Sequence, residues 1–243
     1  MKKITTVLFD LDGTLLPMDQ DIFIKAYFGG ICKRLAPIGY DPQRLVEGIW
    51  AGTAAMVKND GGCLNEAAFW SCFTEMFGKK ALDDIPMFDD YYREDFDKVS
   101  ASCGYTPAAK ETVDLLKSRG IRIALATNPI FPAIATEKRM HWAGLSPTDF
   151  ELYTTYENSR YCKPNLHYYE DILQQMKLSP EQCLMVGNDV GEDMIAEVLG
   201  MKVFLLTGCM INKQNVDISR YPHGDFAALK SYLCQLFPAE SEV

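Results

Sequence analysis

The chain of 243 residues is 48% hydrophobic and 23% charged, which is enough apolar material for the core of one domain or of two modest ones. This composition excludes a disordered or fibrous protein. The formal net charge of −9 excludes a general electrostatic attraction to nucleic acid or to an anionic membrane, so an anionic substrate would need local positive charge.

Eight cysteines are scattered along the chain without a Cys-x-x-Cys pair and without regular spacing to the three histidines. We expect reduced, mostly buried thiols in a cytoplasmic protein, and neither a disulfide framework nor a zinc site. The apolar run after Met1 superficially resembles a secretion signal, but aspartates interrupt it. No other stretch approaches the length of a membrane span.

The first predicted element is a buried strand over residues 4–9, an apolar run that ends in Asp10 and Asp12. In open α/β sheets, ligands bind outside the carboxyl ends of the strands, so a pair of carboxylates there suggests a cation site. A calcium loop does not fit, because the sixth position is Leu15 rather than glycine. Taken alone, the pair could also be a solvated turn.

The next ninety residues have the spacing of helices, with no strand between them. We expect four helices, over residues 19–35, 42–56, 65–77 and 86–103. They form a separate helical unit, with natural hinges near residues 16–17 and 104–105. Five aromatic residues of this unit could line a ligand pocket, but their helical spacing favours the core for most of them: Trp50, Phe69, Trp70, Phe73 and Phe77.

From Thr106 onward, helices and strands alternate. Strands are expected over residues 121–126, 150–154, 182–186 and 203–206, and helices over 106–120, 132–144, 164–177, 192–199 and 226–237. Such alternation predicts βαβ units and a mainly parallel sheet. The chain is therefore expected to form an α/β core that is interrupted after its first strand by the helical unit.

Polar residues follow the later strands as well: Thr127, Asn128, Lys163, Asp189 and Asp193. Each alone has an ordinary explanation, such as a helix cap or a surface charge. Together with the two aspartates of the first strand they form a set at one edge of the sheet. Carboxylates that converge there would repel one another without a divalent cation, and oxygen ligands favour Mg²⁺. A lysine, a hydroxyl and a metal would suit a phosphoryl group.

These residues resemble the motifs of the haloacid dehalogenase (HAD) superfamily of hydrolases, in its phosphatase type. The four motifs are residues 10–14 (Asp-Leu-Asp-Gly-Thr), Thr127, Lys163-Pro164, and residues 187–193, which begin Gly-Asn-Asp and end in Asp193. The resemblance implies a three-layer Rossmann-like α/β core from residues 1–14 and 106–243, and an all-helical cap from residues 15–105.

The same resemblance implies a role for each motif residue. Asp10 would be the nucleophile that forms an aspartyl-phosphate. Asp12 would be the general acid and base, which protonates the leaving group and then activates water. Thr127 and the Asn128 amide would bind the phosphoryl oxygens, and Lys163 would neutralise charge on nucleophile and phosphate.

The implied cofactor is Mg²⁺. Asp10, the backbone carbonyl of Asp12 and Asp189 would hold the ion, and Asp193 would support it or its waters. Two residues depart from the usual pattern, Cys162 before the motif lysine and Pro129 after the phosphate-binding pair. Neither departure removes a catalytic group, but both could change details of the backbone at the phosphate contacts relative to the usual family pattern.

The prediction is thus a Mg²⁺-dependent hydrolase of a small phosphorylated metabolite, with the oligomeric state left open. Asp12 argues against a dehalogenase, whose pattern lacks this second aspartate. Three alternatives stay open: a sugar-phosphate mutase, a phosphonatase with a cap lysine (Lys25, Lys33 or Lys58), and a phosphate-binding protein without catalysis. The last is disfavoured because binding alone needs no nucleophile and acid together.

Overall fold

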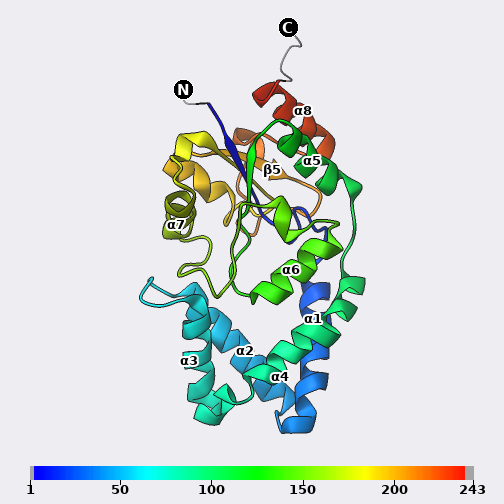
Figure 1. The fold of residues 1–243 in the computed structure, drawn as a ribbon, viewed down its shortest axis with the longest axis vertical. Helices are drawn as coiled ribbons and strands as arrows, with labels where there is room; N and C mark the ends of the chain where they lie inside the picture. The colour runs from blue at the N-terminus through cyan, green and yellow to red at the C-terminus, as the bar shows by residue number, and fades with distance from the viewer. Residues whose placement is uncertain (1–2, 239–243) are drawn as a thin grey trace.

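The computed structural model describes residues 3–238, and its centre is a parallel β-sheet (Figure 1). Six strands lie in the order β3-β2-β1-β4-β5-β6, and every described pair is parallel. The strands are β1 (Thr6–Phe9), β2 (Arg122–Leu125), β3 (Leu152–Tyr153), β4 (Cys183–Gly187), β5 (Lys202–Leu206) and β6 (His223–Gly224). The sequence predicted the first five, whereas β6 has only two residues and no apolar run.

Helices cover both faces of this sheet, as the alternation predicted. Val7 and Phe9 of β1 face a core shared with α5 (Pro107–Ser118), α6 (Ala133–Trp142) and α8 (Phe226–Leu236). Leu8 faces the other side, where α7 (Leu166–Met176) and the 3₁₀-helix η7 (Met194–Leu199) pack. All four residues of β1 are buried. This is the three-layer α/β core that was expected, with β1 at its centre.

Two predicted helices differ from what was expected. The segment expected to be one helix over 86–103 consists of α4 (Ile85–Asp90), a π-helical turn (Tyr91–Asp95) and a 3₁₀-helix (Phe96–Ser102). The reason lies in burial, because the adjacent Tyr91 and Tyr92 both face the interior, and a regular α-helix turns neighbouring side chains about 100° apart. The helix expected over 192–199 is the 3₁₀-helix η7.

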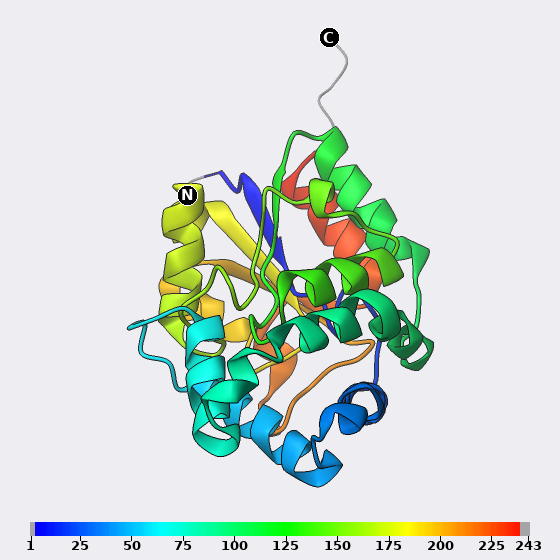
Figure 2. The same cartoon turned by 60° about the horizontal axis from the view of Figure 1, so that its bottom comes forward.

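The remaining helices of the insertion match the predicted ranges closely. They are α1 (Gln20–Leu35), α2 (Pro42–Val57) and α3 (Asn65–Phe77), with short 3₁₀-helices at Ala36–Ile38 and Lys79–Leu82. We call the segment from α1 to Ser102 the helical insertion. It lies below the sheet in Figure 1 and swings forward in Figure 2. No helix of the described residues has the length and apolar character needed to cross a membrane.

Two kinds of contact join the insertion to the core. The chain enters and leaves side by side, since Met18 bridges Cys103 and the Gly104 amide donates to the Pro17 carbonyl at 2.7 Å. Farther away, the fully buried Asn65 at the start of α3 donates from its side chain to the carbonyls of Pro129 and Tyr161, at 3.2 and 3.4 Å. The insertion is therefore fixed to loops that follow β2 and β3.

Candidate active site

The site begins directly after β1, where Asp10 leaves the sheet. Its backbone amide donates to the Val186 carbonyl of β4 at 2.9 Å, which holds the carboxylate at the carboxyl edge. The Thr14 hydroxyl lies 3.1 Å from Asp10 Oδ2 and 2.9 Å from Asn188 Oδ1. Gly13 has a φ of +85°, and a Cβ there would lie 2.4 Å from Asn188 Nδ2. Glycine is thus required for this loop to fold against the end of β4.

Lys163 lies between two carboxylates. Its Nζ is 2.9 Å from Asp10 Oδ1 and 2.6 Å from Asp193 Oδ1, and its side chain is 1% exposed. Burial favours the neutral amine, but the two carboxylates outweigh it and raise the pKa of Lys163 well above its usual value. The lysine is therefore charged and placed to balance negative charge on Asp10.

Asp193 is held on both of its oxygens. Oδ1 accepts from Lys163, and Oδ2 accepts from the Asp189 amide at 2.9 Å. Burial raises the pKa of Asp193, and Lys163 opposes that rise. A Cβ on Gly187 would lie 2.1 Å from Asp193 Oδ2, so the glycine at the end of β4 leaves room for this carboxylate.

Asp12 makes a contact that the sequence did not indicate. Its Oδ2 pairs with the guanidinium of Arg139, a buried residue of α6. The Arg139 guanidinium also lies 4.4 Å from the centre of the Phe131 ring. Asp12 Oδ1 is buried and has no hydrogen-bond partner among the described residues. Burial raises the pKa of Asp12, and Arg139 partly offsets this effect.

The loop after β2 carries Thr127 and Asn128. The Thr127 carbonyl accepts hydrogen bonds from the hydroxyls of Thr154, at 2.6 Å, and Tyr168, at 2.9 Å, which fixes the backbone behind the buried side chain. Asn128 accepts from the Lys163 amide at 3.2 Å and donates to Glu192 at 3.0 Å. The loops of the second, third and fourth motifs are thereby connected.

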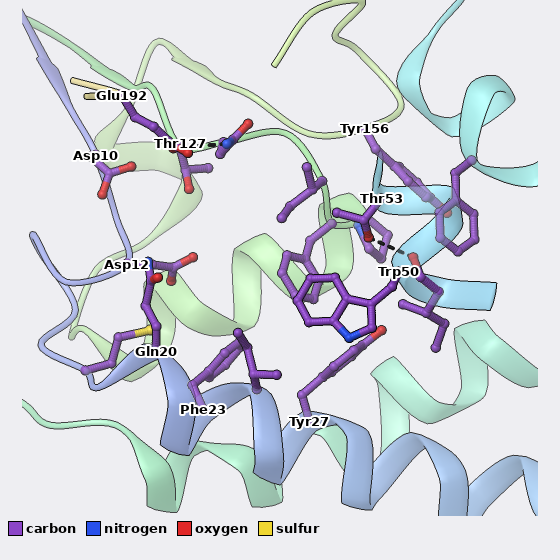
Figure 3. A pocket seen from close by; sticks show the side chains of 18 of the residues that line it. Asp10, Asp12, Gln20, Phe23, Tyr27, Trp50, Thr53, Thr127, Tyr156 and Glu192 are labelled. Atoms are coloured by element: carbon purple, nitrogen blue, oxygen red, sulfur yellow. Dashed lines mark hydrogen bonds between the residues drawn. The ribbon is translucent and has the colours of Figure 1, made fainter. Parts of the chain in front are cut away.

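A cavity of about 340 Å³ opens between these loops and the helical insertion (Figure 3). Asp10, Asp12 and Thr127 lie at one end of it, and Trp50 and Tyr156 lie at the other. Asn128, Asp189 and Asp193 also line it. Lys163 does not line the cavity, but it pairs with Asp10 and Asp193, which do.

The structure therefore brings together all the residues that the motifs singled out, and adds others. No role was predicted from the sequence for Arg139, for Glu192 or for the Asn188 side chain. Asn188 and Glu192 stand inside the fourth motif and could have been suspected from their position alone. Arg139 carried no such signal, because an arginine in a predicted helix normally faces water.

The donor set at this end of the cavity fits a divalent cation. Five carboxyl groups line this end, those of Asp10, Asp12, Asp189, Glu192 and Asp193, and they outnumber the basic side chains near them, which are Lys163, Arg139 and Lys213. A divalent cation such as Mg²⁺ would offset this excess of acidic groups. Within the described residues, no three acidic, histidine or cysteine side chains converge to form a complete metal site. Mg²⁺ commonly uses one or two carboxylates and completes its shell with water and substrate phosphate.

The fold and this site define an enzyme class, and comparison with known proteins identifies it. Residues 4–196 match the family of haloacid dehalogenase-like hydrolases, so the chain belongs to that family.

Curated relatives place it among the phosphatases. It is 26% identical over 215 residues to a ribulose-1,5-bisphosphate 5-phosphatase of Halopiger xanaduensis, covering 83% of this chain and 84% of the relative. It is 27% identical over 210 residues to a phosphoglycolate phosphatase of Vibrio cholerae, covering 85% and 86%.

Solved structures share the fold. A 2-haloacid dehalogenase from Pseudomonas syringae pv. Tomato superposes with a TM-score of 0.62 at 18% identity, covering 96% of this chain and 99% of that one. At this identity the likeness concerns the fold alone. These comparisons confirm the predicted superfamily and the enzyme class of HAD phosphatase.

Proposed function

We propose that the protein hydrolyses small phosphate monoesters in the presence of Mg²⁺, through an aspartyl-phosphate on Asp10. The observation that carries the proposal is the pairing of two unequal carboxylates at one end of the cavity. Asp10 is held by a charged lysine, with Lys163 Nζ 2.9 Å away. Asp12 has one oxygen fixed by Arg139 and the other, Oδ1, without a partner.

In the first step an Asp10 oxygen attacks phosphorus, and the bond between phosphorus and the ester oxygen breaks. Asp12 donates its proton from Oδ1 to the departing alkoxide, which leaves as an alcohol. Its raised pKa suits that role, because a carboxyl group with a higher pKa holds the proton closer to neutral pH.

In the second step a water molecule attacks the aspartyl-phosphate. Asp12, now deprotonated, takes the water proton, and inorganic phosphate leaves while the Asp10 carboxylate is restored. Thr127 and the Asn128 amide bind the phosphoryl oxygens. Lys163 neutralises the negative charge that moves between the phosphate and Asp10 during the two steps.

Mg²⁺ bound by Asp10, the Asp12 carbonyl and Asp189 would offset phosphoryl charge and hold the phosphate in line. Asp193 supports this site indirectly, because Lys163 and the Asp189 amide already occupy its oxygens. We propose that residues 15–105 act as a cap over the catalytic core of residues 1–14 and 106–243, with hinges beside Pro17 and Gly104. The free thiols of all eight cysteines are the basis for proposing a cytoplasmic location.

The alternative reactions have less support. None of Lys25, Lys33 and Lys58 lines the cavity, so a phosphonatase lysine is missing from the insertion side of the described structure. A mutase acting on a sugar would need partners for several hydroxyl groups, and the insertion offers few polar side chains there.

The test is hydrolysis of p-nitrophenyl phosphate with and without Mg²⁺ by the wild type and by Asp10→Asn. We expect Mg²⁺-dependent release of phosphate by the wild type and loss of activity in the variant of at least about 10³-fold. Equal rates in the two proteins would contradict the proposal. Conversion of a hexose 1-phosphate to a 6-phosphate without phosphate release would favour the mutase instead.

A further inference from the structure

The cavity has two chemically different ends. The end formed by the core carries the carboxylates of the site, including Glu192. The end formed by the insertion is lined mainly by aromatic and aliphatic side chains, and eight of its rings reach the cavity: Phe23, Tyr27, Phe28, Trp50, Phe69, Trp70, Phe88 and Tyr92. If phosphate is held at the core end, a substrate that fills this cavity extends from there toward these rings (Figure 3).

Charge distinguishes the two ends further. On the insertion side, among the residues described, the single charged side chain that lines the cavity is Asp89, which is acidic. The one basic residue that lines the cavity in the described structure is Lys213, an exposed residue of the loop after β5. Lys213 also lines a neighbouring depression with Asp189 and Glu192, which places it at the core end. The aromatic end therefore has no cation to pair with a second anionic group.

Two tyrosine hydroxyls of the aromatic wall are satisfied internally, since those of Tyr27 and Tyr92 hydrogen-bond to each other at 2.9 Å. Trp70 adds one neutral donor, because its Nε1 is buried and has no hydrogen-bond partner among the described residues. The wall thus presents ring surfaces to the cavity. Trp50 is the clearest case: its ring lies 5.5 Å from that of Phe28, yet 47% of the residue is exposed while it lines the cavity. An exposed indole at the end of the cavity opposite the phosphate-binding residues is a natural contact for a flat apolar group.

We infer that the leaving group of the substrate is uncharged and apolar, preferably aromatic, and carries no second phosphate or carboxylate. This inference rests on the proposed function and adds the substrate class. It sets the protein apart from the relatives named for a bisphosphate and for phosphoglycolate, both of which bear a second anion. The cavity of about 340 Å³ has room for one ring beside the phosphoryl group.

The physical reason is that an aromatic ring and a carboxylate differ in the free energy of moving from water to the aromatic end of the cavity. Moving an aromatic ring from water into contact with other rings is favourable, roughly in proportion to the area buried. Moving a carboxylate into the same place costs free energy, because no cation replaces its water and Asp89 adds repulsion. The two effects act in opposite directions on kcat/KM, so matched substrates separate them.

The experiment compares wild-type kcat/KM for four alkyl phosphates whose leaving groups differ little in reactivity within each pair. Benzyl phosphate is set against ethyl phosphate, and 4-carboxybenzyl phosphate against benzyl phosphate. Phosphoglycolate, the carboxylated counterpart of ethyl phosphate, completes the set. We expect benzyl phosphate to exceed ethyl phosphate by about 10-fold or more. The added carboxylate should lower kcat/KM about 10-fold or more in both comparisons, that of 4-carboxybenzyl phosphate with benzyl phosphate and that of phosphoglycolate with ethyl phosphate.

Variants then test whether the rings of the insertion cause the preference. Trp50→Ala should reduce the benzyl-to-ethyl ratio by about 3- to 10-fold, because the exposed indole is part of the wall. Val57→Ala is the matched control, since this residue is on the same helix, is 44% exposed and does not line the cavity. Its ratio should equal that of the wild type.

The outcomes separate the two proposals. If the wild type hydrolyses these esters but prefers phosphoglycolate or 4-carboxybenzyl phosphate, the inference on substrate class is wrong and the proposed function stands. An unchanged ratio in Trp50→Ala would also overturn the role of the aromatic wall. If no ester in the set is hydrolysed, or if Asp10→Asn hydrolyses benzyl phosphate as fast as the wild type, the proposed function fails and the inference fails with it.

Discussion

Replacing Arg139 with methionine should destabilise the fold and weaken catalysis together. The guanidinium pairs with Asp12, donates from Nε to the Ala135 carbonyl at 3.2 Å, and donates to the Thr136 hydroxyl at 3.2 Å. It also lies on the Phe131 ring. Methionine fills much of the same volume but leaves the Asp12 carboxylate without its cation.

The size of the effect follows from burial. Removing one partner of a buried ion pair costs about 3–5 kcal/mol, because the other charge stays buried and unpaired. Arg139 is 1% exposed but Asp12 is 23% exposed, so water relieves part of this cost. We expect a loss of about 2–4 kcal/mol in the free energy of unfolding at neutral pH. Asp12→Asn removes the second charge, so the double variant should recover about 1–3 kcal/mol relative to the sum of the single losses.

Urea unfolding of the wild type, the two single variants and the double variant gives this coupling free energy directly. Arg220→Met is the control, because its pair with Glu197 is exposed, at 60% and 41%, and such pairs contribute about 0–1 kcal/mol. The reasoning is refuted if Arg139→Met costs no more than Arg220→Met. It is equally refuted if the losses from Arg139→Met and Asp12→Asn simply add.

Three further predictions concern other parts of the site and the core. Asn65→Ala should lower the unfolding free energy by about 1–3 kcal/mol in urea titration, because two loop carbonyls lose their buried donor; an unchanged midpoint would mean that the insertion is not fixed there. Gly187→Ala should abolish phosphatase activity, since its Cβ would lie 2.1 Å from Asp193 Oδ2, and wild-type turnover would contradict the geometry. Burial tends to raise the pKa of Asp149, but Lys117 and a backbone amide outweigh it and hold that pKa below its usual value. The stabilisation from ionised Asp149 is present above its unfolded pKa of about 3.9 and is lost as pH falls through its pKa in the folded protein. Thermal unfolding should therefore show Asp149→Asn to be less stable than the wild type at pH 7 and similar to it at pH 2 to 3.

The order of elements could be predicted from the sequence because local signals are strong in this chain. Asp19, Asp41 and Thr106 each precede an apolar helical pattern, and the side chain of each accepts from a backbone amide of the first turn. The strands before Asp10 and Thr127 are short apolar runs bounded by polar residues. Their carboxyl ends meet at one edge because parallel strands must align in that way.

What the sequence could not show depends on contacts between distant residues. Arg139 is 127 positions from Asp12, and helical periodicity does not reveal that an arginine will face a carboxylate in the interior. Trp50 and Phe73 have similar helical surroundings in the sequence, yet Phe73 is fully buried and Trp50 is half exposed at the cavity. The π-helical turn at Tyr91 and the two-residue β6 follow from packing against α1 and β5, which local propensity does not encode.

The covalent role of Asp10 is the central claim, and trapping the phosphorylated enzyme tests it most directly. Enzyme mixed with excess p-nitrophenyl phosphate and Mg²⁺ is quenched in acid during turnover, treated with hydroxylamine and mapped by peptide mass spectrometry. The Asp12→Asn variant serves to accumulate the intermediate, because nitrophenolate leaves without much acid assistance whereas water attack needs the base. The account predicts a phosphate on Asp10 that hydroxylamine converts to a hydroxamate at the same residue, and none in Asp10→Asn. Rapid turnover with an unmodified Asp10 peptide, or a phosphate on any other residue, would contradict it.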